Sequence, residues 1–244
     1  MRSDVRGARL LSVVAAGILA AGLSLQGTSA ESPSSQGVTG PSQSSQPQAG
    51  APRTTFDPPG TLPKQRTVHI TGENPGLHLR EKANGPVVSD LNYWRVTWSP
   101  VGTGHVCYLT TGTGKGPNDL RLALTDNEKL AQYVTYETMS KLLPDFADPP
   151  YKVVRATFSV EGDTLNERRE LCTSDQYKVV GVWRKLSPGR FSGMDPGNGF
   201  FMTFIIPIAQ EGELWLNGKR LPGSALPGPG LPPAYLAFAE TWLK

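Results

Sequence analysis

Short runs in which apolar and polar residues alternate recur from residue 66 to the end of the chain. In the segment 92–98, for example, Trp94, Val96 and Trp98 occupy every second position. A period of two gives an extended strand one apolar and one polar side. Patterns of this kind predict strands at Thr67–Ile70, Leu77–Glu81, Asn92–Trp98, Val106–Thr111, Leu120–Leu124, Tyr151–Val160, Glu167–Thr173, Lys178–Lys185, Phe200–Ile208, Glu213–Leu216 and Ala234–Trp242.

Turn residues separate the predicted strands. Asn217-Gly218 lies between two short apolar runs and is typical of a two-residue hairpin. Asn84-Gly85 and the segment 161–163 indicate further turns, and Gly, Pro and Ser concentrate in 187–199 and 222–233, which predicts longer loops. The hairpin over residues 212–219 resembles hairpins of jelly-roll carbohydrate-binding domains, and the resemblance is limited to these eight residues.

One segment has the spacing of a helix. Thr125 and Glu128 match a capping box, and Leu130 and Tyr133 follow at helical intervals until Pro144 ends the pattern. Many short strands and one helix predict a mainly β fold, an antiparallel β-sandwich or barrel (jelly-roll-like or calycin-like) with one short helix. A parallel α/β fold is disfavoured because the connections between most strands are too short to hold a helix.

Residues 1–30 have the three parts of a secretory signal peptide. Arg2, Arg6 and Arg9 give a basic start, Leu10–Leu25 an apolar run, and small residues lead to Ala30. The run is 16 residues long, whereas a helix that spans a bilayer needs roughly 20. We therefore expect cleavage after Ala30, a secreted or periplasmic location and no membrane span after cleavage; the alternative is an uncleaved membrane anchor.

Composition divides the remaining chain in two. Residues 31–65 are dominated by Ser, Gln and Pro and contain few apolar residues, which predicts a disordered linker. All five tryptophans lie in 66–244, which we expect to be a single β-rich domain.

Net charge narrows the range of partners. The formal charge is +3, and loss of three arginines and one aspartate with the signal peptide lowers it to +1. Proteins that bind nucleic acids or anionic membranes usually carry a large excess of basic residues. We therefore expect neither as a partner. The sequence does not indicate an oligomeric state.

Cys107 and Cys172 are the two cysteines of the chain. In an oxidising compartment they are expected to form a disulfide, which would close a loop of about 66 residues and stabilise the fold by roughly 4 kcal/mol. The alternative is a zinc or copper site, in which His105 would join both cysteines together with His69 or His78. We expect the disulfide and no metal.

Motifs for catalysis or for a cofactor do not fit. The glycine-rich segment 112–116 lacks the spacing of a phosphate-binding loop and leads into a predicted strand. Neither a Gly-x-Ser-x-Gly elbow nor a His-Glu-x-x-His helix is present. We predict no cofactor. A pair of catalytic carboxylates among the acids of the strands is the open alternative, since glycoside hydrolysis requires two of them across a cleft.

Polar positions of three predicted strands suggest a binding face. Arg95, Arg121 and Arg155 each stand in the middle of a strand, with Tyr93 and Thr157 nearby on the polar sides. If the strands are neighbours, the guanidinium groups form a cationic stripe that suits a carboxylate, sulfate or acidic sugar. The alternative interpretation is the ordinary wetted face of an antiparallel sheet, on which long polar side chains are common.

Trp215 is a second candidate for ligand binding, because an exposed indole beside a hairpin is suited to stacking on a sugar. The alternative is that Trp215 is a partly buried packing residue.

Three functions follow from these features. The first is a secreted, non-catalytic domain that binds an anionic small molecule or glycan. The second is an extracellular polysaccharide lyase or glycoside hydrolase, with Tyr93 or a histidine as base and an arginine as charge stabiliser. The third is a structural, envelope-associated protein.

Overall fold

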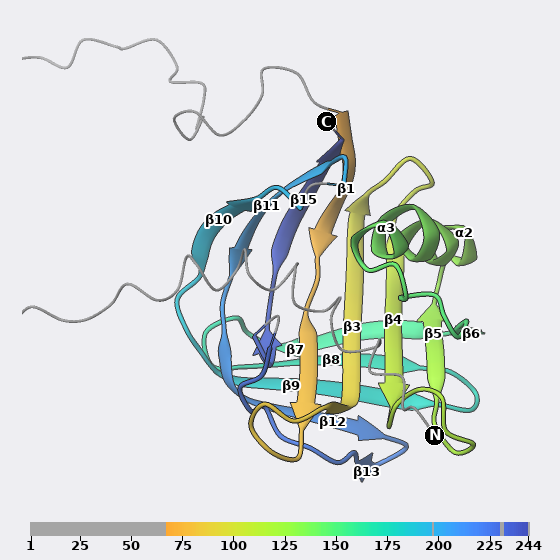
Figure 1. Cartoon of the computed structure of the whole chain (residues 1–244), viewed down its shortest axis with the longest axis vertical. Coiled ribbons are helices and arrows are strands. Elements are labelled where there is room, and N and C mark those ends of the chain that lie inside the picture. The colour runs from red at the N-terminus through yellow and green to blue at the C-terminus, as the bar shows by residue number, and fades with distance from the viewer. Residues whose placement is uncertain (1–66, 197, 230–231, 244) are drawn as a thin grey trace, which may run out of the picture.

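Two β-sheets stacked face to face form the domain. The computed structural model describes residues 67–196, 198–229 and 232–243, and the sequence-based expectations for 1–30 and 31–65 lie outside this range. The larger sheet has ten strands, and Figure 1 shows most of them running vertically. Its order is β10 (Arg190–Met194), β11 (Phe200–Ile206), β15 (Phe238–Leu243), β1 (Thr67–Glu73), β3 (Val87–Trp98), β4 (Gly104–Thr111), β5 (Arg121–Thr125) and β6 (Lys152–Arg155), with β2 (Gly76–Arg80) paired to β3 and β14 (Ala234–Tyr235) paired to β2.

The smaller sheet has five strands, all antiparallel, which run crosswise to those of the larger sheet (Figure 1). Its order is β13 (Lys219–Arg220), β12 (Ala209–Leu216), β9 (Lys178–Leu186), β8 (Glu167–Thr173) and β7 (Thr157–Gly162). The predicted Asn217-Gly218 hairpin joins β12 to β13, and both turn residues have positive φ, as this tight turn requires.

The main core lies between the sheets, where the apolar sides of the alternating strands meet. Leu91, Leu109 and Leu122 of the larger sheet pack in one buried cluster with Trp183 and Leu214 of the smaller sheet. Trp183 also donates its indole N–H to the Gly76 carbonyl at 2.9 Å, which ties the two sheets together by a buried hydrogen bond.

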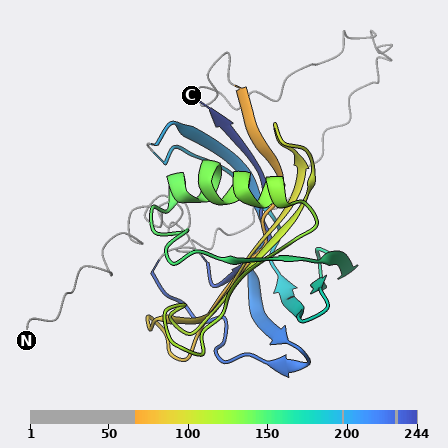
Figure 2. The same ribbon diagram turned by 90° about the vertical axis from the view of Figure 1, so that its right-hand side faces the viewer.

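Within residues 67–243, as far as the structure describes them, a single helical segment covers the other face of the larger sheet (Figure 2). It consists of α2 (Glu128–Gln132), a π-helical stretch η1 (Tyr133–Met139) and α3 (Ser140–Leu142). Its Leu130 and Val134 pack on Trp94 and Val106 in a second core. None of the helices in the described residues has both the length and the apolar character needed to cross a membrane.

The predicted helix is confirmed, but its cap is different. Asn127, not Thr125, is the N-cap, and its side chain accepts a hydrogen bond from the Leu130 amide. The Thr125 hydroxyl instead donates to the backbone carbonyls of His105 and Asn127. Thr125 is the last residue of β5, so its side chain closes the strand end rather than the helix start.

The sandwich is confirmed and the barrel alternative is wrong, since the strands form two separate sheets. The predicted strand Tyr151–Val160 breaks at Ala156. Its first half is β6, parallel to β5, and its second half is β7 in the smaller sheet. Ala156 donates its amide to Thr125 at 2.9 Å at this change of sheet. Strand β10 lies in the segment 187–199, which the sequence predicts as a loop.

Candidate functional site

The larger sheet places the predicted binding arginines on opposite faces. Along β3, Tyr93 belongs to the core between the sheets and Trp94 to the core under the helical segment, so Arg95 points with Tyr93 toward the smaller sheet. Along β5, Leu122 belongs to the core between the sheets, and Arg121 therefore points to the helical side. The cationic stripe is therefore not formed. The pairing of the strands decides which face of the sheet each arginine points to, and the alternation within a single strand does not indicate that pairing.

The other members of that proposed face are also separated. Arg121 donates to the Phe146 carbonyl at 2.7 Å, and its guanidinium lies 4.1 Å from the centre of the Tyr151 ring. Arg155 is exposed at the edge strand β6. Thr157 belongs to the other sheet, where it is exposed and donates to the Thr173 carbonyl at 3.3 Å. These residues do not surround a common ligand position.

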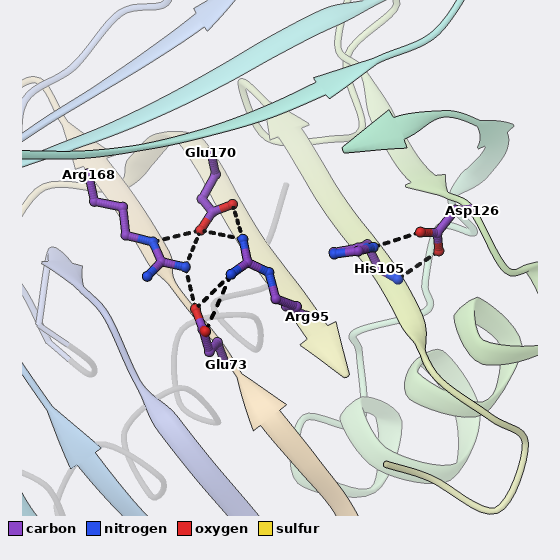
Figure 3. Close-up of polar contacts among 6 residues, drawn as sticks. All are labelled: Glu73, Arg95, His105, Asp126, Arg168 and Glu170. Atoms are coloured by element: carbon purple, nitrogen blue, oxygen red, sulfur yellow. Dashed lines mark hydrogen bonds and ion pairs between the residues drawn. The ribbon is translucent and has the colours of Figure 1, made fainter. Parts of the chain in front are cut away.

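Arg95 instead belongs to a closed ion cluster of two arginines and two glutamates between the sheets (Figure 3). It lies 3.4 Å from a Glu73 oxygen and 3.1 Å from a Glu170 oxygen, while Arg168 pairs with the same two carboxylates. Burial raises the pKa of Glu170, and both arginines oppose that rise. The four formal charges cancel, so this cluster offers no uncompensated cation to an anionic ligand.

Tyr93 is fully buried beside this cluster rather than exposed at a binding face. Burial, followed by the charge of Glu170, raises the pKa of its hydroxyl well above its usual range. Its cross-strand neighbour is Cys107, a buried free thiol that lies near the buried free thiol of Cys172. The two cysteines thus lie together, one from each sheet, and a covalent bond between them stays a prediction.

His105 and Asp126 form a second set of polar contacts, separate from the ion cluster (Figure 3). Its Nδ1 lies 2.6 Å from one oxygen of Asp126, whose other oxygen accepts the His105 amide at 2.7 Å. The ring stacks on Phe158 of the smaller sheet, with centroids 4.8 Å apart, and Arg95 is its cross-strand neighbour. Among the described residues, no group of three His, Cys, Asp or Glu side chains is placed to hold a metal ion.

The outward face of the smaller sheet carries an aromatic and cationic hollow. Leu214 and Leu216, on either side of Trp215, point into the core or pack against it. Trp215 therefore points to the outward face, where it is half-buried. Val180 pairs with Trp215 across β9 and β12. The hollow has a volume of about 260 Å³ and is lined by Arg169, Lys178, Val180, Val182, Arg184, Glu213, Trp215 and Gly218.

Comparison of the chain with protein-family models, with curated proteins and with solved structures gave no match.

Ion pairs fix most charges around the hollow. Arg184 lies 3.2 Å from Glu213 and also pairs with Glu167, and Arg169 lies 2.6 Å from Glu167. Lys178 is exposed and has no ion-pair partner within the described part of the chain. Lys178 is thus the cation of the hollow that is available to a ligand.

The position of Trp215 on an outward face agrees with its place in the alternation, whereas the sequence pattern does not indicate the neighbours that form the hollow. Lys178, Val180 and Val182 also alternate, and that signal was present. Both sides of β9 are apolar in the middle, however, so the pattern alone did not identify the outer side. The pairing of β9 with β12 supplies the missing information.

Proposed function

We propose that this protein is an exported, non-catalytic binding domain whose ligand is an anionic glycan, and that the hollow at Trp215 is its binding site. The observation that carries the proposal is a half-buried indole, flanked by Val180 and Val182, in a hollow lined by three cations and one carboxylate. The predicted signal peptide and linker support a location where polysaccharides are the available ligands.

The chemistry of the hollow suits a sugar that carries a carboxylate or sulfate. The apolar C–H face of a sugar ring stacks on an indole, and the polar edge of the ring remains available for hydrogen bonds. The Trp215 indole N–H donates to Glu213 at 3.2 Å, which holds the ring in place before the ligand arrives. Lys178 then supplies a charge-assisted bond to the acidic group.

Isothermal titration of the exported protein with acidic oligosaccharides and their neutral counterparts tests this site. Trp215→Ala is expected to weaken binding at least about tenfold. Lys178→Met is expected to remove most of the preference for the acidic sugar, since it deletes a charge-assisted hydrogen bond. Trp98→Ala is the matched control, because Trp98 is 45% exposed but lies on the larger sheet. Equal affinity of Trp215→Ala and wild type would contradict the proposal.

We also propose that Cys107 and Cys172 form a disulfide between the sheets after export. Oxidation of the two thiols releases two electrons and two protons, which a thiol–disulfide oxidant of the oxidising compartment accepts. In the denatured exported protein, neither cysteine should react with an alkylating reagent until a reductant is added. Reduction should lower the free energy of unfolding by up to about 4 kcal/mol. Alkylation of both cysteines without reductant would exclude the bond.

The His105–Asp126 pair favours one second candidate, an extracellular polysaccharide lyase or glycoside hydrolase. Asp126 engages Nδ1 of His105, which leaves Nε2 as the atom that could exchange a proton with a substrate. An incubation of the exported protein with acidic polysaccharides should then release new chain ends, and His105→Asn should abolish the release. Intact polymer with wild-type protein would exclude this candidate and leave the binding function unaffected.

A further inference from the structure

A row of outward-facing residues crosses the whole smaller sheet through the hollow. The strand register places one residue of each strand in line, and every neighbouring pair in this row is directly opposed. The cross-strand row consists of Ser159 on β7, Leu171 on β8, Val180 on β9, Trp215 on β12 and Arg220 on β13.

The row is apolar in its middle and polar at both ends. Leu171, Val180 and Trp215 are half-buried, whereas Ser159 and Arg220 are exposed. Neighbouring strands lie about 4.8 Å apart, so four steps extend over roughly 19 Å. This is about the length of four linked sugar rings, and a single ring would cover only the part around Trp215.

The two sides of the row differ in charge. On one side, the opposed residues of β7, β8 and β9 are Thr157, Thr173 and Lys178, with no acid among them. On the other side, Glu161 and Glu213 flank Arg169 and Val182. On the second side, Glu213 is paired with Arg184 and Arg220, and Arg169 is paired with Glu167, so these charges largely compensate one another. An anionic group attached to a ligand on the row is therefore attracted to Lys178 on the first side.

We infer that the ligand is an extended acidic oligosaccharide which lies across the strands along this row, with its acidic groups toward Lys178. The inference rests on the proposed function, because it specifies the ligand of the same hollow. A chain in this position stacks its apolar ring faces on Trp215, Val180 and Leu171 and reaches hydrogen-bonding side chains at both ends. Thr157 and Thr173 can accept or donate hydrogen bonds to hydroxyls along the same edge.

Titration with a length series of acidic oligosaccharides, from one to six rings, tests the inference. Affinity should rise at least about tenfold between two and four rings, as contacts at the ends of the row are added, and should then level off. Ser159→Glu places a carboxylate at the β7 end of the row. This variant should bind two rings as wild type does but lose the gain from the third and fourth.

Val153→Glu is the matched control, because Val153 is 49% exposed on β6, which belongs to the larger sheet and lies outside the row. It should keep the full gain with chain length. Equal affinity for two and six rings, with sensitivity to Trp215→Ala, would overturn the extended ligand and retain the proposed site. Unchanged length dependence in Ser159→Glu would overturn the inferred path. Absence of binding at every length would remove both the proposed function and this inference.

Discussion

His69 is a buried histidine with both ring nitrogens occupied. The Tyr133 hydroxyl lies 2.7 Å from Nδ1 and the Thr138 hydroxyl 2.9 Å from Nε2, and the side chain lies under the helical segment. Burial, followed by the positive charge of Lys141, lowers the pKa of His69 from 6.5 to about 4. The folded protein therefore holds the neutral ring of His69, and protonation of this ring lowers the stability of the folded state.

This histidine makes stability depend on pH. The unfolded chain binds a proton at His69 near pH 6.5, and the folded chain only near pH 4, so stability should fall as the pH decreases from about 6.5 to 4. The loss attributable to His69 should reach about 2–3 kcal/mol. Urea unfolding at pH 7 and pH 4.5 measures it. The variant His69→Gln should show a smaller loss between these two pH values, and parallel losses in the two proteins would disprove the assignment.

Single residues could be assigned to a side of their own strand, but not to a side of the sheet. Alternation correctly separates Trp94 from Arg95 along β3. The partners of Arg95 could not be predicted, because Glu170 follows 75 positions later in the chain and meets it only through the packing of the two sheets. The same limit applies to His105, whose partner Asp126 stands at the end of the next strand.

At the scale of elements, the ion cluster joins β1 and β3 to β8. Glu170→Gln removes one of its two negative charges and leaves two buried or half-buried arginines with a single carboxylate. This should lower the free energy of unfolding by about 3–5 kcal/mol, because an uncompensated charge remains away from water. Glu167→Gln is the control, since Glu167 also pairs with two arginines but is 33% exposed, and its loss should be below about 1 kcal/mol.

The double variant Arg168→Met with Glu170→Leu tests the charge argument itself. It removes one charge of each sign and leaves the Arg95–Glu73 pair, so it should be more stable than Glu170→Gln alone. Chemical denaturation of the three variants side by side gives the comparison. A double variant less stable than the single one would show that packing, and not charge balance, determines the contribution of these residues.

Element boundaries were predictable where turn chemistry is local and failed where the chain changes sheets. Asn217-Gly218 specifies its hairpin because both residues tolerate positive φ. At Ala156 the alternation continues without interruption, and yet β6 and β7 belong to different sheets. A small residue at the crossing is compatible with a continuous strand, so only the competing partners β5 and β8 decide where the strand divides.

At the scale of the whole molecule, the two sheets share one core and should unfold as one unit. Trp183 is fully buried in that core and donates to the Gly76 carbonyl across the sheet interface. Trp183→Phe keeps an aromatic ring but leaves this carbonyl without its donor, which should cost about 1–3 kcal/mol. Because the contact belongs to both sheets, the loss should appear in every part of the domain rather than in the smaller sheet alone.

Hydrogen exchange followed by mass spectrometry distinguishes a loss of stability in the whole domain from a loss in the smaller sheet alone. In the wild-type protein and in Trp183→Phe, the amides of β3 and β4 should lose protection together with those of β8 and β9. The substitution should lower the protection of both groups of amides by the same free energy. A substitution confined to the outward face, Val180→Ala, should leave this coupling intact because Val180 is outside the shared core. If β8 and β9 opened first, the larger sheet with its helical segment would be a separate cooperative unit. The smaller sheet, with the proposed ligand hollow, would then be ordered mainly by its docking on that unit.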